Sequence, residues 1–155
     1  MAYTIPNSDD AFGGSGQASP DKVDFDIITA GSGLTGVVSG CAATVTGSNM
    51  VVTIAAGVIM VAGKEVAVAA GDVTIGTAHA TLPRYDLVTV NSSGTKAVTA
   101  GDAASSPVFK AVPAGSVCLY AVWVPQTDTA ITSGQLVDKR VLIVRDTDAL
   151  AYIHF

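Results

Sequence analysis

The residues of this sequence that are best suited to catalysis or metal binding are two histidines, His79 and His154, and the paired carboxylates of Asp24-Phe25-Asp26. A hydrolytic site needs a nucleophile, a base and a group that orients the base. The histidines are far apart in the sequence, and no Gly-x-Ser-x-Gly, Cys-x-x-Cys or His-Glu-x-x-His motif accompanies them. The two aspartates match the start of a calcium loop, but the later acidic ligand and the glycine of such a loop are missing. The sequence therefore predicts no enzyme, no cofactor and no metal site.

Two pairs of opposite charges have an i, i+2 spacing: Arg84 with Asp86, and Asp138 with Arg140. Alternate residues of a strand face the same side of a sheet, so the members of each pair can bind each other or cap neighbouring turns. Charges at strand ends are usually solvated or structural. We interpret both pairs as architectural.

The composition is that of one β-rich domain. The chain has 155 residues, of which 49% are hydrophobic but only 6% aromatic, and 16 glycines divide the apolar residues into short runs. This pattern is typical of β-sandwiches and barrels. We predict an all-β fold, with a single antiparallel β-sandwich or barrel-like domain and an extended N-terminal arm. No apolar run reaches the length of a membrane helix, and no secretory signal is predicted.

The charge distribution argues against nucleic acid as a partner. The net charge is −5, and the eight Lys and Arg residues are scattered except for Lys139-Arg140. A phosphate backbone requires a basic stripe, which is absent. The two cysteines, Cys41 and Cys118, lie in apolar runs and are predicted to be buried free thiols rather than a disulfide.

The sequence divides into an arm (residues 1–34), a β-domain (35–144) and a C-terminal tail (145–155). The arm is rich in Gly, Ser and Asp, which allows a solvated tail, but apolar residues recur along it. We favour an arm whose apolar side chains fill pockets on neighbouring subunits. The predicted contact residues are Tyr3, Ile5, Phe12, Val23, Phe25 and Ile27.

Two terminal segments carry further expectations. Residues 23–27 alternate apolar and acidic side chains, so they can form an edge strand or pair with a partner's sheet. The tail ends on Tyr152, Ile153 and Phe155, which we expect to pack on the domain or on another subunit.

Within the β-domain, short β-like runs are separated by Gly, Asn or Asp, which predicts an antiparallel meander. The runs are residues 35–39, 42–46, 50–55, 57–62, 65–69 and 73–75, then a central hairpin of 85–90 with 95–99, then 116–124 and 137–144. The predicted core residues are Val88, Val90, Leu119, Ala121 and Trp123, with the tryptophan as an anchor.

Three segments together resemble modules of structural proteins in tailed bacteriophages. They are AAGVIMVAGKEVAVAAG (55–71), LPRYDLVTVNSSGTKAVTAG (82–101) and PVFKAVPAGSVCLYAVWVPQTDTAITSGQLVDKRV (107–141). The similar modules occur at the base of tail fibres, in upper-baseplate-like proteins and in head-fibre or capsid decoration proteins. The resemblance covers residues 35–141 and implies a β-rich, often trimeric connector without catalytic activity.

The resemblance also implies partners and a location. It implies that the protein is made in the host cytoplasm and lies on the virion surface. There it is expected to form a homotrimer bound to the major capsid protein or another shell protein. Tail fibres continue beyond the Asp-Lys-Arg segment into a shaft and tip, whereas only residues 141–155 follow here. Capsid decoration or cementing is therefore favoured over a tail-fibre or baseplate connector. A carbohydrate-binding adhesion module is a further alternative, although aromatic residues are few.

Overall fold

The computed structural model describes residues 33–144 of the chain, and these residues form ten strands and one short 3₁₀ helix. The strands are β1 (Gly36–Gly40), β2 (Ala43–Thr44), β3 (Val51–Ile54), β4 (Gly57–Val61), β5 (Lys64–Val68), β6 (Gly71–Thr74), β7 (Arg84–Asn91), β8 (Lys96–Thr99), β9 (Ser116–Val124) and β10 (Leu136–Asp138), with η2 (Ser133–Gln135) before β10. The predicted contacts of the arm and tail, at Tyr3, Ile5, Phe12, Val23, Phe25, Ile27, Tyr152, Ile153 and Phe155, lie outside the described residues. The all-β prediction is confirmed.

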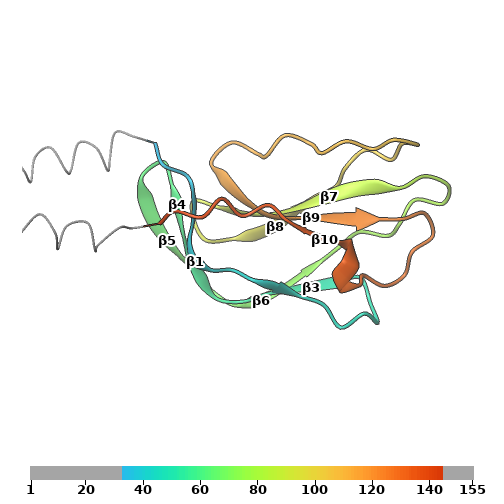
Figure 1. Ribbon diagram of the computed structural model, residues 1–155, viewed down its shortest axis with the longest axis horizontal. Coiled ribbons are helices and arrows are strands. Elements are labelled where there is room, and N and C mark those ends of the chain that lie inside the picture. The colour runs from blue at the N-terminus through green and yellow to red at the C-terminus, as the bar shows by residue number, and fades with distance from the viewer. Residues whose placement is uncertain (1–32, 145–155) are drawn as a thin grey trace, which may run out of the picture.

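The strands form three antiparallel sheets, with the orders β1-β4-β5, β10-β9-β7-β8 and β2-β3-β6. Within residues 33–144 no sheet closes into a barrel, and the arrangement is consistent with a β-sandwich. The four-stranded sheet forms one layer, β3 and β6 lie across from it, and β4 and β5 close one end (Figure 1). Buried side chains from all three sheets meet in one apolar core. The described residues contain no helix that is long and apolar enough to span a membrane.

The first six strands are three long, bent strands. β1 pairs with β4 and β2 pairs with β3, so residues 36–44 run antiparallel to residues 53–60 with a bend between them. β4 pairs with β5 and β3 with β6, which repeats the arrangement for residues 51–61 and 64–74. The meander predicted from the sequence is present, but its units are three bent strands and not six short ones.

The bend has a local cause, which is marked in the sequence by a glycine. Gly40 and Cys41 both have positive φ, 67° and 59°, which turns the chain from one sheet into the next. The bent strands stay bonded to each other there, through Cys41 N to Ala56 O at 3.2 Å and Ala55 N to Ala42 O at 2.8 Å. A Cβ on Gly57 would lie 2.6 Å from Cys41 Sγ, so only glycine fits opposite the turn.

Strands β7 and β9 form the centre of the sandwich. Val88, Val90, Leu119 and Ala121 are all fully buried. Trp123 is only half-buried, and its prediction as a core anchor was wrong. Side chains alternate along a strand, and Val122 and Val124 both face the inner core, so the tryptophan between them faces outward.

The last predicted strand, 137–144, is shorter than expected. β10 ends at Asp138, and the chain then moves from β9 to β1. Val37 N donates to Val141 O and Ile143 N donates to Val37 O, both at 2.8 Å, so residues 141–143 run parallel to β1.

Candidate functional site

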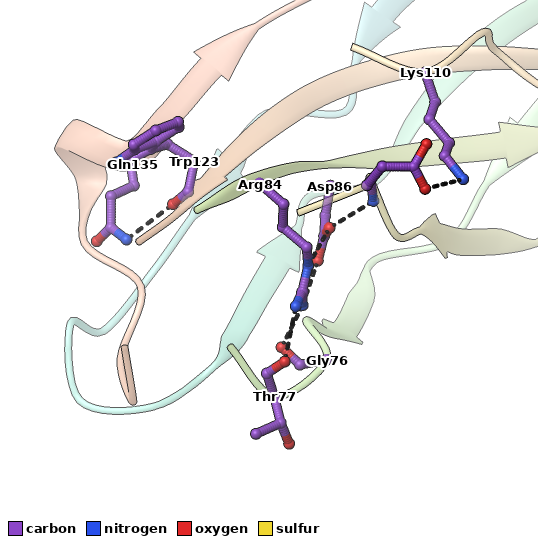
Figure 2. Close-up of polar contacts among 9 residues, drawn as sticks. Gly76, Thr77, Arg84, Asp86, Lys110, Trp123 and Gln135 are labelled. Carbon is purple, nitrogen blue, oxygen red and sulfur yellow. Dashed lines mark hydrogen bonds and ion pairs between the residues drawn. The ribbon is translucent and has the colours of Figure 1, made fainter. Parts of the chain in front are cut away.

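The Arg84–Asp86 pair is a buried structural link. Arg84 Nε and Nη2 lie 2.7 and 3.0 Å from the two carboxylate oxygens of Asp86, and the residues are 8% and 0% exposed. The guanidinium also donates to the carbonyls of Thr77 and Gly76, both at 2.8 Å, and Gly101 N donates to Asp86 Oδ1 at 2.9 Å (Figure 2). These bonds tie the loop before β7, at residues 76–77, and the loop after β8, at residue 101, to the start of β7. They leave little of either charged group for chemistry.

The Asp138–Arg140 pair is a surface link of the same spacing. Arg140 Nη2 lies 2.6 Å from Asp138 Oδ2, and Arg140 Nη1 donates to Gly40 O at 3.0 Å. The guanidinium also lies over the ring of Tyr120, 5.3 Å from its centroid. The side-chain hydrogen bond from Arg140 lowers the pKa of Asp138, and the same bond raises the pKa of Arg140. This pair joins the end of β10 to the end of β1.

The described histidine, His79, organises a loop. Its Nδ1 accepts from the backbone nitrogens of Thr81 and Leu82 at 3.2 and 3.1 Å, and its carbonyl accepts from Thr127 N at 2.9 Å. Within residues 33–144, no group of three or more His, Cys, Asp or Glu side chains is placed to hold a metal ion. His154 and the Asp24-Phe25-Asp26 pair lie outside the described residues.

The most unusual surface is the segment that runs beside β1, residues 141–144. Val141, Leu142 and Val144 are 67%, 62% and 83% exposed, whereas Ile143 packs against Gly36. The segment bonds to β1 on one side, and in the described part of the chain no strand pairs with its other side. It is a short apolar edge, held to β1 by a single bridge, and none of its four residues is charged or a proline.

A groove adjoins this edge. It has a volume of about 410 Å³ and lies over the outer face of β7 and β9, between residues 109–112 and 139–141. Its lining comprises Thr35, Gly36, Leu87, Phe109, Lys110, Val112, Ser116, Val117, Cys118, Lys139 and Val141. Most of these side chains are apolar, and the two lysines are its only charged lining residues.

Aromatic contacts hold the loop after β8 over the outer face of β7 and β9. The ring of Tyr85 lies 4.6 Å from that of Phe109 and 4.8 Å from that of Trp123, centroid to centroid. Lys139 Nζ lies 4.1 Å from the Phe109 centroid, and Lys110 Nζ forms an ion pair with Asp102 at 3.1 Å. The loop after β8 is therefore fixed over the sheet at this position.

Cys41 and Cys118 are both free thiols, as predicted, but the predicted burial is confirmed only for Cys41. Cys41 is fully buried, but Cys118 is partly exposed and lines the groove. Burial raises the pKa of both thiols, which keeps them protonated near neutral pH.

From the sequence, contact surfaces were predicted in the arm and tail, but neither the edge nor the groove was predicted. The signal for the edge was the unbroken apolar run Val141–Val144 after the charged Lys139-Arg140, which was assigned to a regular final strand. The groove had a weaker signal, because Phe109 and Val112 lie in a loop whose path over the sheet depends on long-range contacts.

Comparison with known protein families, with curated proteins and with solved structures finds no match to this chain.

Proposed function

We propose that this protein is a non-enzymatic structural module that forms a homotrimer on the surface of a tailed-bacteriophage virion, where it decorates or cements the capsid. The observation that carries the proposal is the exposed apolar edge at residues 141–144. An unprotected edge of this kind pairs with other chains, and natural monomers avoid it. A second copy that covers the edge removes Leu142 and Val144 from water.

The phage context comes from the resemblance of residues 35–141 to modules of virion proteins, and one feature of the fold suits it. Both ends of the described chain leave the domain at the end that holds β4 and β5 (Figure 1). The arm, residues 1–34, and the tail, residues 145–155, are therefore attached at one end of the domain. An arm that binds the major capsid protein leaves the opposite end free to project outward.

Trimer formation would strengthen attachment through the arms. Once one arm is bound, the other two are held close to the shell, which raises their effective concentration. Weak contacts by single residues such as Tyr3, Ile5 and Phe12 then add to a firm attachment. This arrangement needs neither a catalytic group nor a cofactor.

Light scattering on the full chain over a range of concentrations tests the assembly step. Wild type is expected at three times the chain mass of 15.5 kDa, and the double variant Leu142→Lys/Val144→Lys at the mass of one chain. Val108→Lys is the matched control, because Val108 is 75% exposed but lies outside the edge. A wild-type protein that stays monomeric at every concentration contradicts the proposal.

Imaging of phage particles tests the location. Wild-type protein is expected on the capsid, and the triple arm variant Tyr3→Ala/Ile5→Ala/Phe12→Ala is expected to remain a trimer that no longer attaches. Protein found on the tail instead would favour a tail-fibre or baseplate connector, which can use the same edge and arm.

A carbohydrate-binding role is a second candidate, favoured by one observation. Trp123, Tyr85 and Phe109 form a row of aromatic rings on the outer face, and Phe109 is 44% exposed. Exposed aromatic rings with polar neighbours are common in sugar sites. A glycan screen in which wild type binds and Phe109→Ala does not would support this role over pure assembly.

A further inference from the structure

We propose that the groove under Phe109 binds residues 23–28 of the same chain, VDFDII, in an extended conformation. This inference goes beyond the proposed function, because it concerns how the chain covers its own surface and does not depend on a virion or a shell. It assigns Val23, Phe25 and Ile27 to a site within the chain, and leaves Tyr3, Ile5 and Phe12 for contacts with partners.

The apolar and basic side chains that line the groove favour an occupant that is apolar on one face and negatively charged on the other. Its floor includes Leu87 and Cys118, and its walls include Phe109 (44% exposed), Val112 (43%) and Val141 (67%). These exposed fractions are high for side chains of this size around a concave site. A ligand that fills the groove would remove them from water.

Charge restricts the choice of occupant. Lys110 and Lys139 both line the groove, although the chain as a whole has a net charge of −5, and Lys139 Nζ lies 4.1 Å from the centroid of the Phe109 ring. The side chain of Lys110 is still 39% exposed beside its partner Asp102, so its ammonium group is accessible to a second carboxylate. Carboxylates along the upper face of an occupant would lie near both lysines.

Residues 23–28 match this pattern. In an extended chain, Val23, Phe25 and Ile27 project to one face and Asp24 and Asp26 to the other, because side chains alternate. The apolar face fits the floor and walls, and the acidic face lies toward the lysines. The tail, residues 145–155, does not match, since its two aspartates precede its apolar residues and do not alternate with them.

The connection between segment and groove is short enough for binding within one chain. Thr35 and Gly36 line the groove, and only residues 29–34 separate them from Ile28. Six residues span up to about 20 Å when extended, which allows the chain to fold back along the sheet. Gly33 has φ of 66°, a left-handed conformation that glycine adopts readily and that is common in tight turns. Such a tether gives a high effective concentration.

Cysteine cross-linking in the full chain tests the proposal directly, because Cys118 lines the groove. We would prepare Val23→Cys and Ile27→Cys, and use Phe12→Cys as the matched control from the same arm. Mild oxidation is expected to join Cys118 to the new thiol at 23 or 27 within one chain, so the band stays at the mass of a single chain on a non-reducing gel. The control is expected to form much less of this product. Peptide mass spectrometry identifies the joined residues.

Three results would overturn the proposal: no disulfide to Cys118 from either position, equal cross-linking of Phe12→Cys, or a disulfide that joins two chains. The last result would place the segment in the groove of a neighbouring copy. Light scattering of the same samples reports the oligomeric state separately, so a failed cross-link and a failed trimer are distinguished.

Alkylation of Cys118 gives a second measurement without new cysteines. Phe25→Asp removes the largest apolar side chain of the segment and should raise the alkylation rate of Cys118 about tenfold at fixed pH, the change expected for a modest loss of binding free energy. Phe12→Asp should leave the rate unchanged, and fully buried Cys41 serves as the internal reference for global unfolding. Equal Cys118 rates in the two variants contradict the proposal.

Discussion

Arg84 Nε lies 2.7 Å from Asp86 Oδ1 on the inner face of β7, opposite Val124 and Val122 of β9. The pair shares this face with the fully buried Val88. Both charges are nearly removed from water, and backbone groups of two loops complete their hydrogen bonding. An ion pair in this setting fixes the arrangement of the groups around it, because each buried charge is stable only while its partner is present.

Asp86→Asn is therefore expected to destabilise the protein strongly. The substitution leaves the guanidinium of Arg84 buried without a counter-charge, and the free energy of unfolding should fall by about 3–5 kcal/mol. Urea denaturation at fixed protein concentration measures the loss. The matched control is Asp138→Asn, which breaks the surface pair with Arg140 and should lower the free energy of unfolding by less than about 1 kcal/mol. Losses of equal size would show that burial of the first pair is unimportant.

The sequence predicted these pairs better than their surroundings. The i, i+2 spacing is a local property, so the pairing of Arg84 with Asp86 and of Asp138 with Arg140 followed from strand geometry. Burial of the first pair depends on loops at residues 76–77 and 101 that return to β7 from both sides of it in sequence, and no local pattern encodes this. Trp123 shows the same limit, because an apolar run does not reveal which face of the sheet is covered.

The sequence predicted the bent strands only in part. Gly40 and Gly57 marked breaks in the apolar runs, but a bend and a hairpin turn use the same residue types. Only the register, Gly40 opposite Gly57, shows that both strands continue through the bend. The edge at residues 141–144 was hidden for a related reason: the chain leaves β9 for β1, and this change of partner is a long-range event.

Gly36→Ala should release the exposed edge from the domain. A Cβ at Gly36 would lie 2.5 Å from Val141 O and 3.1 Å from Ile143 Cγ1, so the segment beside β1 must move away. We expect faster tryptic cleavage after Arg140 and, if the proposed trimer forms through this edge, its loss in light scattering. Gly134→Ala is the matched control, because a Cβ at Gly134 would meet no atom within 4 Å and the same change should have little effect there. Unchanged cleavage in Gly36→Ala would mean that the segment does not depend on close contact with β1.

The Asp138–Arg140 pair predicts a pH dependence with a definite sign. The hydrogen bond from Arg140 lowers the pKa of Asp138 in the folded state, so the pair contributes stability at pH values above the ordinary aspartate pKa of about 3.9. That contribution is lost as the pH falls through the folded-state pKa. When the pH is lowered from about 6 to below about 3, the free energy of unfolding should therefore fall more for wild type than for Asp138→Asn. Parallel curves of unfolding free energy against pH for the two proteins would contradict the prediction.

The turn between β4 and β5 offers a stabilising substitution. Ala62 and Gly63 form a two-residue turn between the paired Val61 and Lys64, and both have positive φ, 50° and 82°. This is the geometry of a type I′ turn, in which Asn-Gly is preferred because asparagine tolerates the left-handed region better than alanine. Ala62→Asn should raise the free energy of unfolding by about 0.5–1 kcal/mol, measured by urea denaturation.

Gly63→Ala provides the comparison of opposite sign, because it adds a Cβ to a second left-handed residue and should lower the free energy of unfolding by about 1 kcal/mol or more. Ala62 is exposed and its side chain is a single methyl group, so lost packing cannot mask the gain from asparagine. The two substitutions change neighbouring residues in one turn and should move stability in opposite directions. If Ala62→Asn destabilises the protein, the left-handed conformation at residue 62 is not a source of strain, and the register of β4 and β5 is set by their side chains alone.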